Sequence, residues 1–337
     1  MQQDFHFYTI YTLARVAGIE DESAQIIAYA SQYMDDAKSE DRIRFEDGGS
    51  YQPIMTAHRF LTLDILSEDV FLKIFVPFHF IPGNVEEKDF YKKMICLPDS
   101  LPAREMIADV LSDREKPYFF HRMGIALHTY ADSWAHQNFS GLLRQENRIY
   151  DLKVEDQLIH VEQYFDENWM RQTINLIPPL GHGQAGSIPD IPYKKWKYRN
   201  HEGREIEVNN TERFLSACEA IFKILCLISD HPIQCPWERM REYLKNIFSY
   251  RGDLKQRIAY WKRWIRSGKF GFQKEKLDYH PSMWQQDAVE AIDGKKNLVK
   301  KKEGFLESNW KLFYDAAILH RFYILHQLLP RYDIYCS

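Results

Sequence analysis

The chain has 337 residues, 45% of them hydrophobic and 15% aromatic, which is enough to bury a sizeable core in one large domain or two ordinary ones. Its formal net charge of −4 is small for this length and gives no nucleic-acid signature by itself. The five cysteines form no CxxC pair, which argues against a disulfide framework and a thiolate zinc site and favours a reducing compartment.

Targeting signals are not evident. The N-terminal segment lacks a basic start and an uninterrupted apolar stretch, so we expect no signal peptide. No run of about 18 apolar residues occurs, which argues against a transmembrane segment. We therefore expect a soluble, cytoplasmic protein. The sequence indicates no oligomeric state.

Helical periodicity dominates the chain, so we expect an all-α protein with long irregular loops. Extended structure is expected only as short pieces, within 37–52 and at 204–208. A Gly/Pro-rich loop is expected at 178–192. The expected helices cover 6–17, 22–33, 56–66, a segment beginning after Ser100, 117–140, 151–176, 211–229, 236–248, 252–267, 282–293 and 303–328.

The composition changes near residues 200–210. Nine of the thirteen histidines lie at or before position 201, and the chain beyond is basic, aromatic and helical in pattern. We expect a metal-binding helical core over residues 1–205 and a C-terminal helical part over 206–337 packed on it, with a single domain as the alternative.

The prediction of a metal site depends mainly on the stretch 118–141, YFFHRMGIALHTYADSWAHQNFSG. Its His128, Asp132 and His136 are four residues apart and share one face of a helix, and His121 falls on the same stripe. The remaining residues are largely apolar, which predicts a buried helix whose polar groups need partners. A divalent metal ion would satisfy all three side chains, and a buried hydrogen-bond network is the alternative.

Further imidazoles and carboxylates occur at separate places in the N-terminal half. Each alone is more often an ordinary core or surface residue, but zinc and similar ions favour these ligand types. Their positions at helix ends and in loops predict a multi-metal site assembled around the central helix. They are His6, Asp35, Asp36, His58, His79, His182 and Asp190.

The central segment resembles a known family. Residues 123–132, MGIALHTYAD, followed by His136 and Asn138-Phe139, are similar to the HxxxD helix of the zinc-dependent phospholipase C/P1 nuclease fold. The order of the other candidate ligands also agrees, over roughly residues 1–190. The resemblance implies a multi-helix bundle that binds one to three zinc ions. The implied ligands are His6, Asp36, His58, His128, Asp132, His136, His182 and Asp190.

The chain departs from that family in three places. The N-terminal tryptophan ligand is absent, with Asp4 as the candidate replacement. The last histidine follows Asp132 by four residues rather than six, and the final HxxxE motif is missing, with His182 and Asp190 as candidates for its role. The sequence is more similar to bacterial proteins of unknown activity that share ALHTYADSWAHQNFSG and GHG…PD motifs.

The metal site, if present, predicts the chemistry. Two zinc ions can generate hydroxide and stabilise the oxygens of a phosphoester, so we expect a hydrolase acting on a phosphoester small molecule, a nucleotide or a lipid head group. By resemblance, Asp36 would orient the water, and Arg59 or Arg122 could neutralise a phosphate. The alternative is a non-catalytic helical binding protein with a structural metal or a buried His/Asp network.

Overall fold

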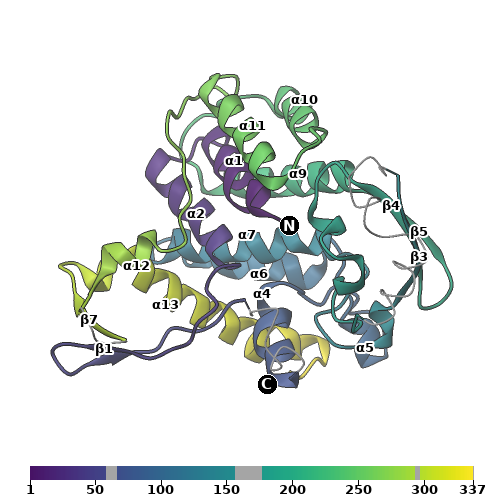
Figure 1. Ribbon diagram of the computed structural model, residues 1–337, viewed down its shortest axis with the longest axis horizontal. Coiled ribbons are helices and arrows are strands. Elements are labelled where there is room, and N and C mark those ends of the chain that lie inside the picture. Colours follow the sequence, from purple (N-terminus) through teal and green to yellow (C-terminus); the bar gives the residue numbers. More distant parts are fainter. Residues whose placement is uncertain (58–66, 156–176, 293–296, 337) are drawn as a thin grey trace.

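The structure is a computed structural model, and it describes residues 1–57, 67–155, 177–292 and 297–336. Helix α7 (Phe119–Ala135) runs through its centre, and every residue of this helix except Phe120 is buried. Helices α2 (Asp21–Tyr33), α6 (Leu101–Ser112), α9 (Asn210–Ile228) and α13 (Asn309–Phe322) pack around it (Figure 1). The apolar stretch predicted to be a buried helix therefore forms the axis of the molecule.

A glycine allows α2 to approach α7 closely. A Cβ added at Gly124 would lie 2.3 Å from the carbonyl oxygen of Ile27 and 2.7 Å from Cβ of Ala30. This contact fixes the C-terminal half of α2, and the turn that follows it, beside the polar stripe of α7.

The all-α prediction is wrong, because the described residues include seven short strands that form two sheets. A four-stranded sheet has the order β2-β1-β7-β6, and a three-stranded antiparallel sheet has the order β3-β4-β5. The strands are β1 (Ile43–Phe45), β2 (Ser50–Tyr51), β3 (Ile149–Val154), β4 (Lys195–Asn200), β5 (Glu205–Asn209), β6 (Val289–Ala291) and β7 (Leu298–Lys301).

Strands β1 and β2 lie within 37–52 and β5 overlaps 204–208, the short extended pieces expected from the sequence, whereas the other four strands were not expected. Strand β3 occupies the start of the helix expected at 151–176, whose remainder from 156 lies outside the described residues. In β4, Trp196 and Tyr198 are buried while Lys195 and Arg199 are exposed, a period-two alternation that the helical reading overlooked. The helix expected at 56–66 lies almost entirely outside the described residues.

The other helical elements lie before and after α7 in the chain. On the N-terminal side they are η1 (Asp4–Thr9), α1 (Ile10–Val16), α3 (Glu68–Val70), η3 (Phe71–Phe75), α4 (Val76–Phe78) and α5 (Phe90–Lys93). On the C-terminal side they are η4 (Gln145–Asn147), η5 (Gly183–Ala185), η6 (Ile188–Asp190), α10 (Trp237–Phe248), α11 (Leu254–Arg266), α12 (Met283–Ala288), η7 (Phe305–Glu307), η8 (Tyr323–Leu328) and η9 (Leu329–Tyr332).

One hydrophobic cluster runs from Met1 to Cys336 and takes in residues on both sides of position 205. A smaller cluster lies under the three-stranded sheet and includes Phe139, Trp196 and Tyr198. In the part of the chain that the structure describes, no helix combines the length and apolar character that a bilayer crossing needs.

Candidate metal centre

Asp132 lies at the centre of a buried group of histidines. Its Oδ2 atom is 3.2 Å from His128 Nε2 and 3.3 Å from His79 Nδ1. Its Oδ1 atom is 3.2 Å from His6 Nε2. Helix α7 supplies His128 and Asp132, η1 supplies His6, and His79 comes directly after α4. The four-residue spacing on α7 therefore brings its side chains to a point where two other segments converge.

Three sets of side chains place possible ligand atoms within 4.8 Å of one another. Two sets share His128, and His6 of the first set also lies beside Asp132 of the second. The third set lies one helical turn further along, at the end of α7. The sets are His6, Asp35 and His128; His79, His128 and Asp132; and His136, His182 and Asp190.

Four of the histidines are anchored through one ring nitrogen to a backbone carbonyl. Because a carbonyl oxygen only accepts, that nitrogen carries the proton and the other presents its lone pair to the cluster. This is the arrangement that orients histidine ligands in metal sites. The donors are His128 Nδ1 to Ser31 O (2.8 Å), His79 Nε2 to Thr56 O (2.8 Å), His136 Nδ1 to His79 O (2.8 Å) and His182 Nδ1 to Gly186 O (2.9 Å).

The anchoring leaves an excess of acceptors at the centre. His128 Nε2 and His79 Nδ1 lie 3.0 Å apart, and both approach Asp132 Oδ2. Neither ring nitrogen of His6 has a hydrogen-bond partner of acceptable geometry, although this side chain is fully buried. His128 Nε2, His79 Nδ1 and Asp132 Oδ2 are three acceptors at such distances, so they need a shared proton or a cation between them.

The protonation of these groups follows from burial and charge. Burial raises the pKa of Asp132, but the amino group of Met1 and the surrounding imidazoles outweigh it and hold this pKa well below its usual range. Burial lowers the pKa of His6 well below its ordinary value and that of His136 to about 3. Burial also acts to lower the pKa of His79, but Asp132 and Asp35 raise it above its ordinary value. An ionised carboxylate with neutral imidazoles is the form that binds metal.

The amino group of Met1 also lies in the cluster. It is 2.6 Å from Asp132 Oδ1 and 3.2 Å from Asp190 Oδ1. Burial would lower its pKa, but the carboxylates of Asp132, Asp190 and Asp35 raise it to about 11. This ammonium group supplies one positive charge beside three carboxylates, so it does not balance the site alone.

A cavity of about 520 Å³ opens from the cluster. Asp35, Asp132 and Asp190 line it together with His79, His136 and His182. Its other walls are apolar, and one lysine lies at its edge. These lining residues include Lys38, Phe75, Phe80, Ile177 and Leu180. Three carboxylates and largely apolar walls form a lining that favours a cation beside an apolar group, so an anionic ligand would need a cation in the cluster.

Most of the predicted ligands meet in space. The structure brings together six of them: His6, His128, Asp132, His136, His182 and Asp190. Two residues that sequence reasoning had named only as weak candidates join them. His79 was discounted as a lone histidine in a loop, and Asp35 was passed over for its neighbour Asp36. His58 and Arg59 lie outside the described residues.

Three predicted residues have other partners. Asp36 turns away from the cluster, and its Oδ2 atom accepts hydrogen bonds from Tyr279 Oη (2.7 Å) and Gln32 Nε2 (3.2 Å). Arg122 is buried and forms ion pairs with Asp109 and Asp113, so its guanidinium is already neutralised. Asp4, the candidate replacement for the missing tryptophan, instead pairs with Arg257 at 2.6 Å.

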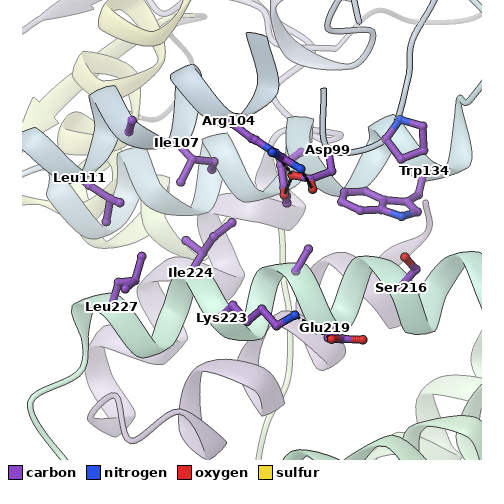
Figure 2. A pocket seen from close by; sticks show the side chains of 14 residues that line it. Asp99, Arg104, Ile107, Leu111, Trp134, Ser216, Glu219, Lys223, Ile224 and Leu227 are labelled. Carbon is purple, nitrogen blue, oxygen red and sulfur yellow. Dashed lines mark hydrogen bonds and ion pairs between the residues drawn. The ribbon is translucent and has the colours of Figure 1, made fainter. Parts of the chain in front are cut away.

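A second cavity, of about 690 Å³, lies between α6 and α9 (Figure 2). Apolar side chains such as Ile107, Leu111 and Ile224 line much of it, and Asp99 and Arg104 pair with each other. Its lining residues include no histidine or cysteine. The groups of side chains that could hold a metal ion therefore adjoin the first cavity and not this one.

Comparison with known proteins adds a family. A family profile described as "Family of unknown function (DUF6765)" matches residues 1–328. No match was found among the curated proteins or among the solved structures.

Proposed function

Because the chain belongs to the family of unknown function DUF6765, whose description carries no activity, we propose a function from the chain's own residues. The His/Asp cluster binds one to three divalent metal ions, preferably zinc, and the adjacent cavity binds a phosphoester that is hydrolysed there. The substrate is a small phosphoester, a nucleotide or a lipid head group.

The observation that carries the proposal is the convergence of lone pairs on Asp132. The side chains that would hold the ions are His6, Asp35 and His128 in one set, His79, His128 and Asp132 in the second, and His136, His182 and Asp190 in the third. Nitrogen and carboxylate oxygen ligands with carbonyl-anchored imidazoles match the preferences of zinc. When bound, zinc makes water more acidic and neutralises the charge of a phosphoester.

The chain's own residues have distinct parts in this proposal. Asp35 belongs to one of the three sets and also lines the cavity. Its carboxylate can therefore orient a water molecule there or accept its proton. Asp36 cannot take this part, because Tyr279 and Gln32 hold it elsewhere. Lys38 lines the cavity and lies 3.7 Å from Asp36 at a partly exposed site, so it can turn from this weak pair to a phosphate oxygen, while Phe75 and Phe80 exclude water.

One observation supports a second candidate function. A proton on His79 and the amino group of Met1 can together satisfy Asp132 without a metal ion. In that case the cluster is a buried polar network that stabilises a non-catalytic binding protein. The five cysteines are unpaired, which supports a reducing compartment such as the cytoplasm for either function.

A hydrolysis assay separates the two functions. Protein reconstituted with zinc is tested on aryl phosphomonoesters and diesters, a dinucleotide and a phosphatidylcholine. We expect turnover of at least one substrate, loss of about 100-fold or more in Asp132→Asn, and loss on chelation that added zinc reverses. Turnover that survives both Asp132→Asn and chelation would contradict the proposal. Absence of turnover with the whole panel would favour the binding protein.

A further inference from the structure

Apart from the lysine run at 295–302, positive charge in this acidic chain is concentrated around α11. Residues 250–276 contain nine Lys and Arg and two Asp and Glu, whereas the whole chain has a net charge of −4. The segment comprises α11 and the turns on either side of it. In Figure 1, α11 lies beside α10 at the edge of the molecule opposite α13.

Five exposed cations of this segment have no carboxylate partner among the described residues. Their neighbours Arg257, Lys262 and Lys274 are instead paired with Asp4, Asp278 and Asp21. Arg266 acts on Asp278 only beyond salt-bridge distance, so these charges are largely available to a ligand. We call these five residues the α11 basic patch: Lys255, Arg263, Arg266, Lys269 and Lys276.

The patch is elongated. Trp261 and Ile265 are buried on one face of α11, and the charged residues lie on its solvent-exposed side. Lys255 and Arg266 are eleven residues apart in the helix, a distance of about 16 Å. Arg266 Nε donates to the carbonyl of Glu275 (3.2 Å), which brings Lys276 near the helix end. The patch carries five cations, so it can neutralise up to about five phosphates of a strand that runs along it.

Aromatic rings lie between these charges. Tyr260 and Trp264 are partly exposed on α11. The guanidinium of Arg263 lies 5.1 Å from the centre of the Tyr260 ring, and the ammonium of Lys269 lies 4.7 Å from that of Trp264. Cations alternating with rings form the kind of surface on which unpaired bases stack while their phosphates are neutralised.

The same surface is a poor match for a membrane. The exposed large hydrophobic side chains of the described residues include none between 237 and 276. Peripheral membrane helices combine basic residues with apolar side chains that insert below the head groups. We propose that the α11 basic patch binds single-stranded nucleic acid. This binding does not depend on the function of the metal centre.

Salt-dependent binding tests the proposal. A fluorescently labelled single-stranded 15-mer is titrated with the full chain, and anisotropy is followed from 50 to 200 mM salt. Five phosphate contacts predict that log K falls with log salt with a slope of about −3.5. The triple variant Arg263→Gln/Arg266→Gln/Lys269→Gln should reduce this slope by about 2 and weaken binding at 50 mM salt by about tenfold or more.

Two further variants make the test specific. Lys300→Gln/Lys301→Gln/Lys302→Gln removes the same charge from exposed positions in and after β7 and should leave binding within about twofold of wild type. Tyr260→Leu should weaken binding about fivefold or more with an unchanged salt slope, because it removes a ring and no charge.

Three results would overturn the proposal. The first is no binding of the oligonucleotide by the wild-type chain at 50 mM salt. The second is an equal loss of affinity in the β7 control variant, which would indicate a response to net charge alone. The third is preferential binding to phosphatidylserine vesicles that the oligonucleotide does not displace. Thermal unfolding of each variant within about 3 °C of wild type shows that the fold is retained.

Discussion

Gly124 offers a test of how the fold holds the candidate metal centre. It lies in the buried helix α7, one turn before His128, and faces α2. In Gly124→Ala, the new Cβ would lie 2.3 Å from the carbonyl oxygen of Ile27. Backbone cannot swing aside as a side chain can, so α2 must move away from α7. Ser31, whose carbonyl anchors His128, lies on the same helix and would move with it.

Whether Gly124→Ala raises or lowers the free energy of unfolding shows which matters more, the close contact with α2 or the higher helix propensity of alanine. Glycine to alanine in an exposed helix interior stabilises a protein by about 1 kcal/mol. Overpacking a close-packed core costs about 1–3 kcal/mol and occasionally more. With backbone as the obstacle, we expect the larger cost and a net loss of about 2 kcal/mol, a factor of roughly 30 in the unfolding equilibrium constant.

Urea unfolding followed by circular dichroism measures this loss. The matched control is Gly183→Ala, because the atoms nearest to an added Cβ there are 3.9 Å away. The control should remain within about 0.5 kcal/mol of wild type. A Gly124→Ala variant as stable as wild type, or more stable, would refute the close-approach argument.

Three further predictions address other groups. Asp4→Asn should lower the free energy of unfolding by about 3 kcal/mol, because it leaves the buried guanidinium of Arg257 without its carboxylate; a change below about 1 kcal/mol in chemical denaturation would contradict this. Burial lowers the pKa of His121 to about 4, so the unfolded chain binds this proton first as the pH falls. Stability should therefore be full above pH 6.5 and fall by about 3 kcal/mol toward pH 4, and His121→Gln should remove that share of the loss in pH-dependent unfolding. Asp35→Ala should reduce zinc content and Asp36→Ala should not, because only the first carboxylate faces the cluster, and elemental analysis showing the reverse order would contradict the assignment.

The shared face and the burial of the candidate ligands on and at the end of α7 could be predicted from sequence for a simple reason. A four-residue spacing on a long apolar helix fixes both the shared face and the burial of His128, Asp132 and His136. His6 has comparable support from the buried element around it. Their convergence with His182 and Asp190, from a loop far along the chain, has no periodic signal and was expected from the residue types and from the family resemblance.

The choice between Asp35 and Asp36 could not be made in this way. Helix α2 ends at Tyr33, and the turn that follows rotates each side chain independently of the helical period. His79 was equally hard to predict, because it follows a three-residue helix in an irregular region. Positions outside regular elements carry no periodic signal, so only the tertiary structure assigns them to the site.

Strands β1, β2 and β5 lie at the short extended pieces expected from the sequence, but their assembly into sheets and the other four strands were missed for a related reason. Their strands have two to six residues, too short for a strong pattern against the surrounding helical signal. Strand β4 does show alternation, with Trp196 and Tyr198 facing the smaller hydrophobic cluster. The sequence analysis assigned this segment to no element, although lysine and arginine are ordinary residues on the exposed face of a sheet.

Anomalous diffraction at the zinc edge, on crystals of protein purified without chelator and supplied with zinc, tests the central claim most directly. We predict at least one strong peak within about 2.3 Å of a carboxylate oxygen of Asp132 and of a ring nitrogen of His79 or His128. A map without a peak in this cluster, in crystals whose solution contains ample zinc, would contradict the metal centre and leave a buried polar network in its place.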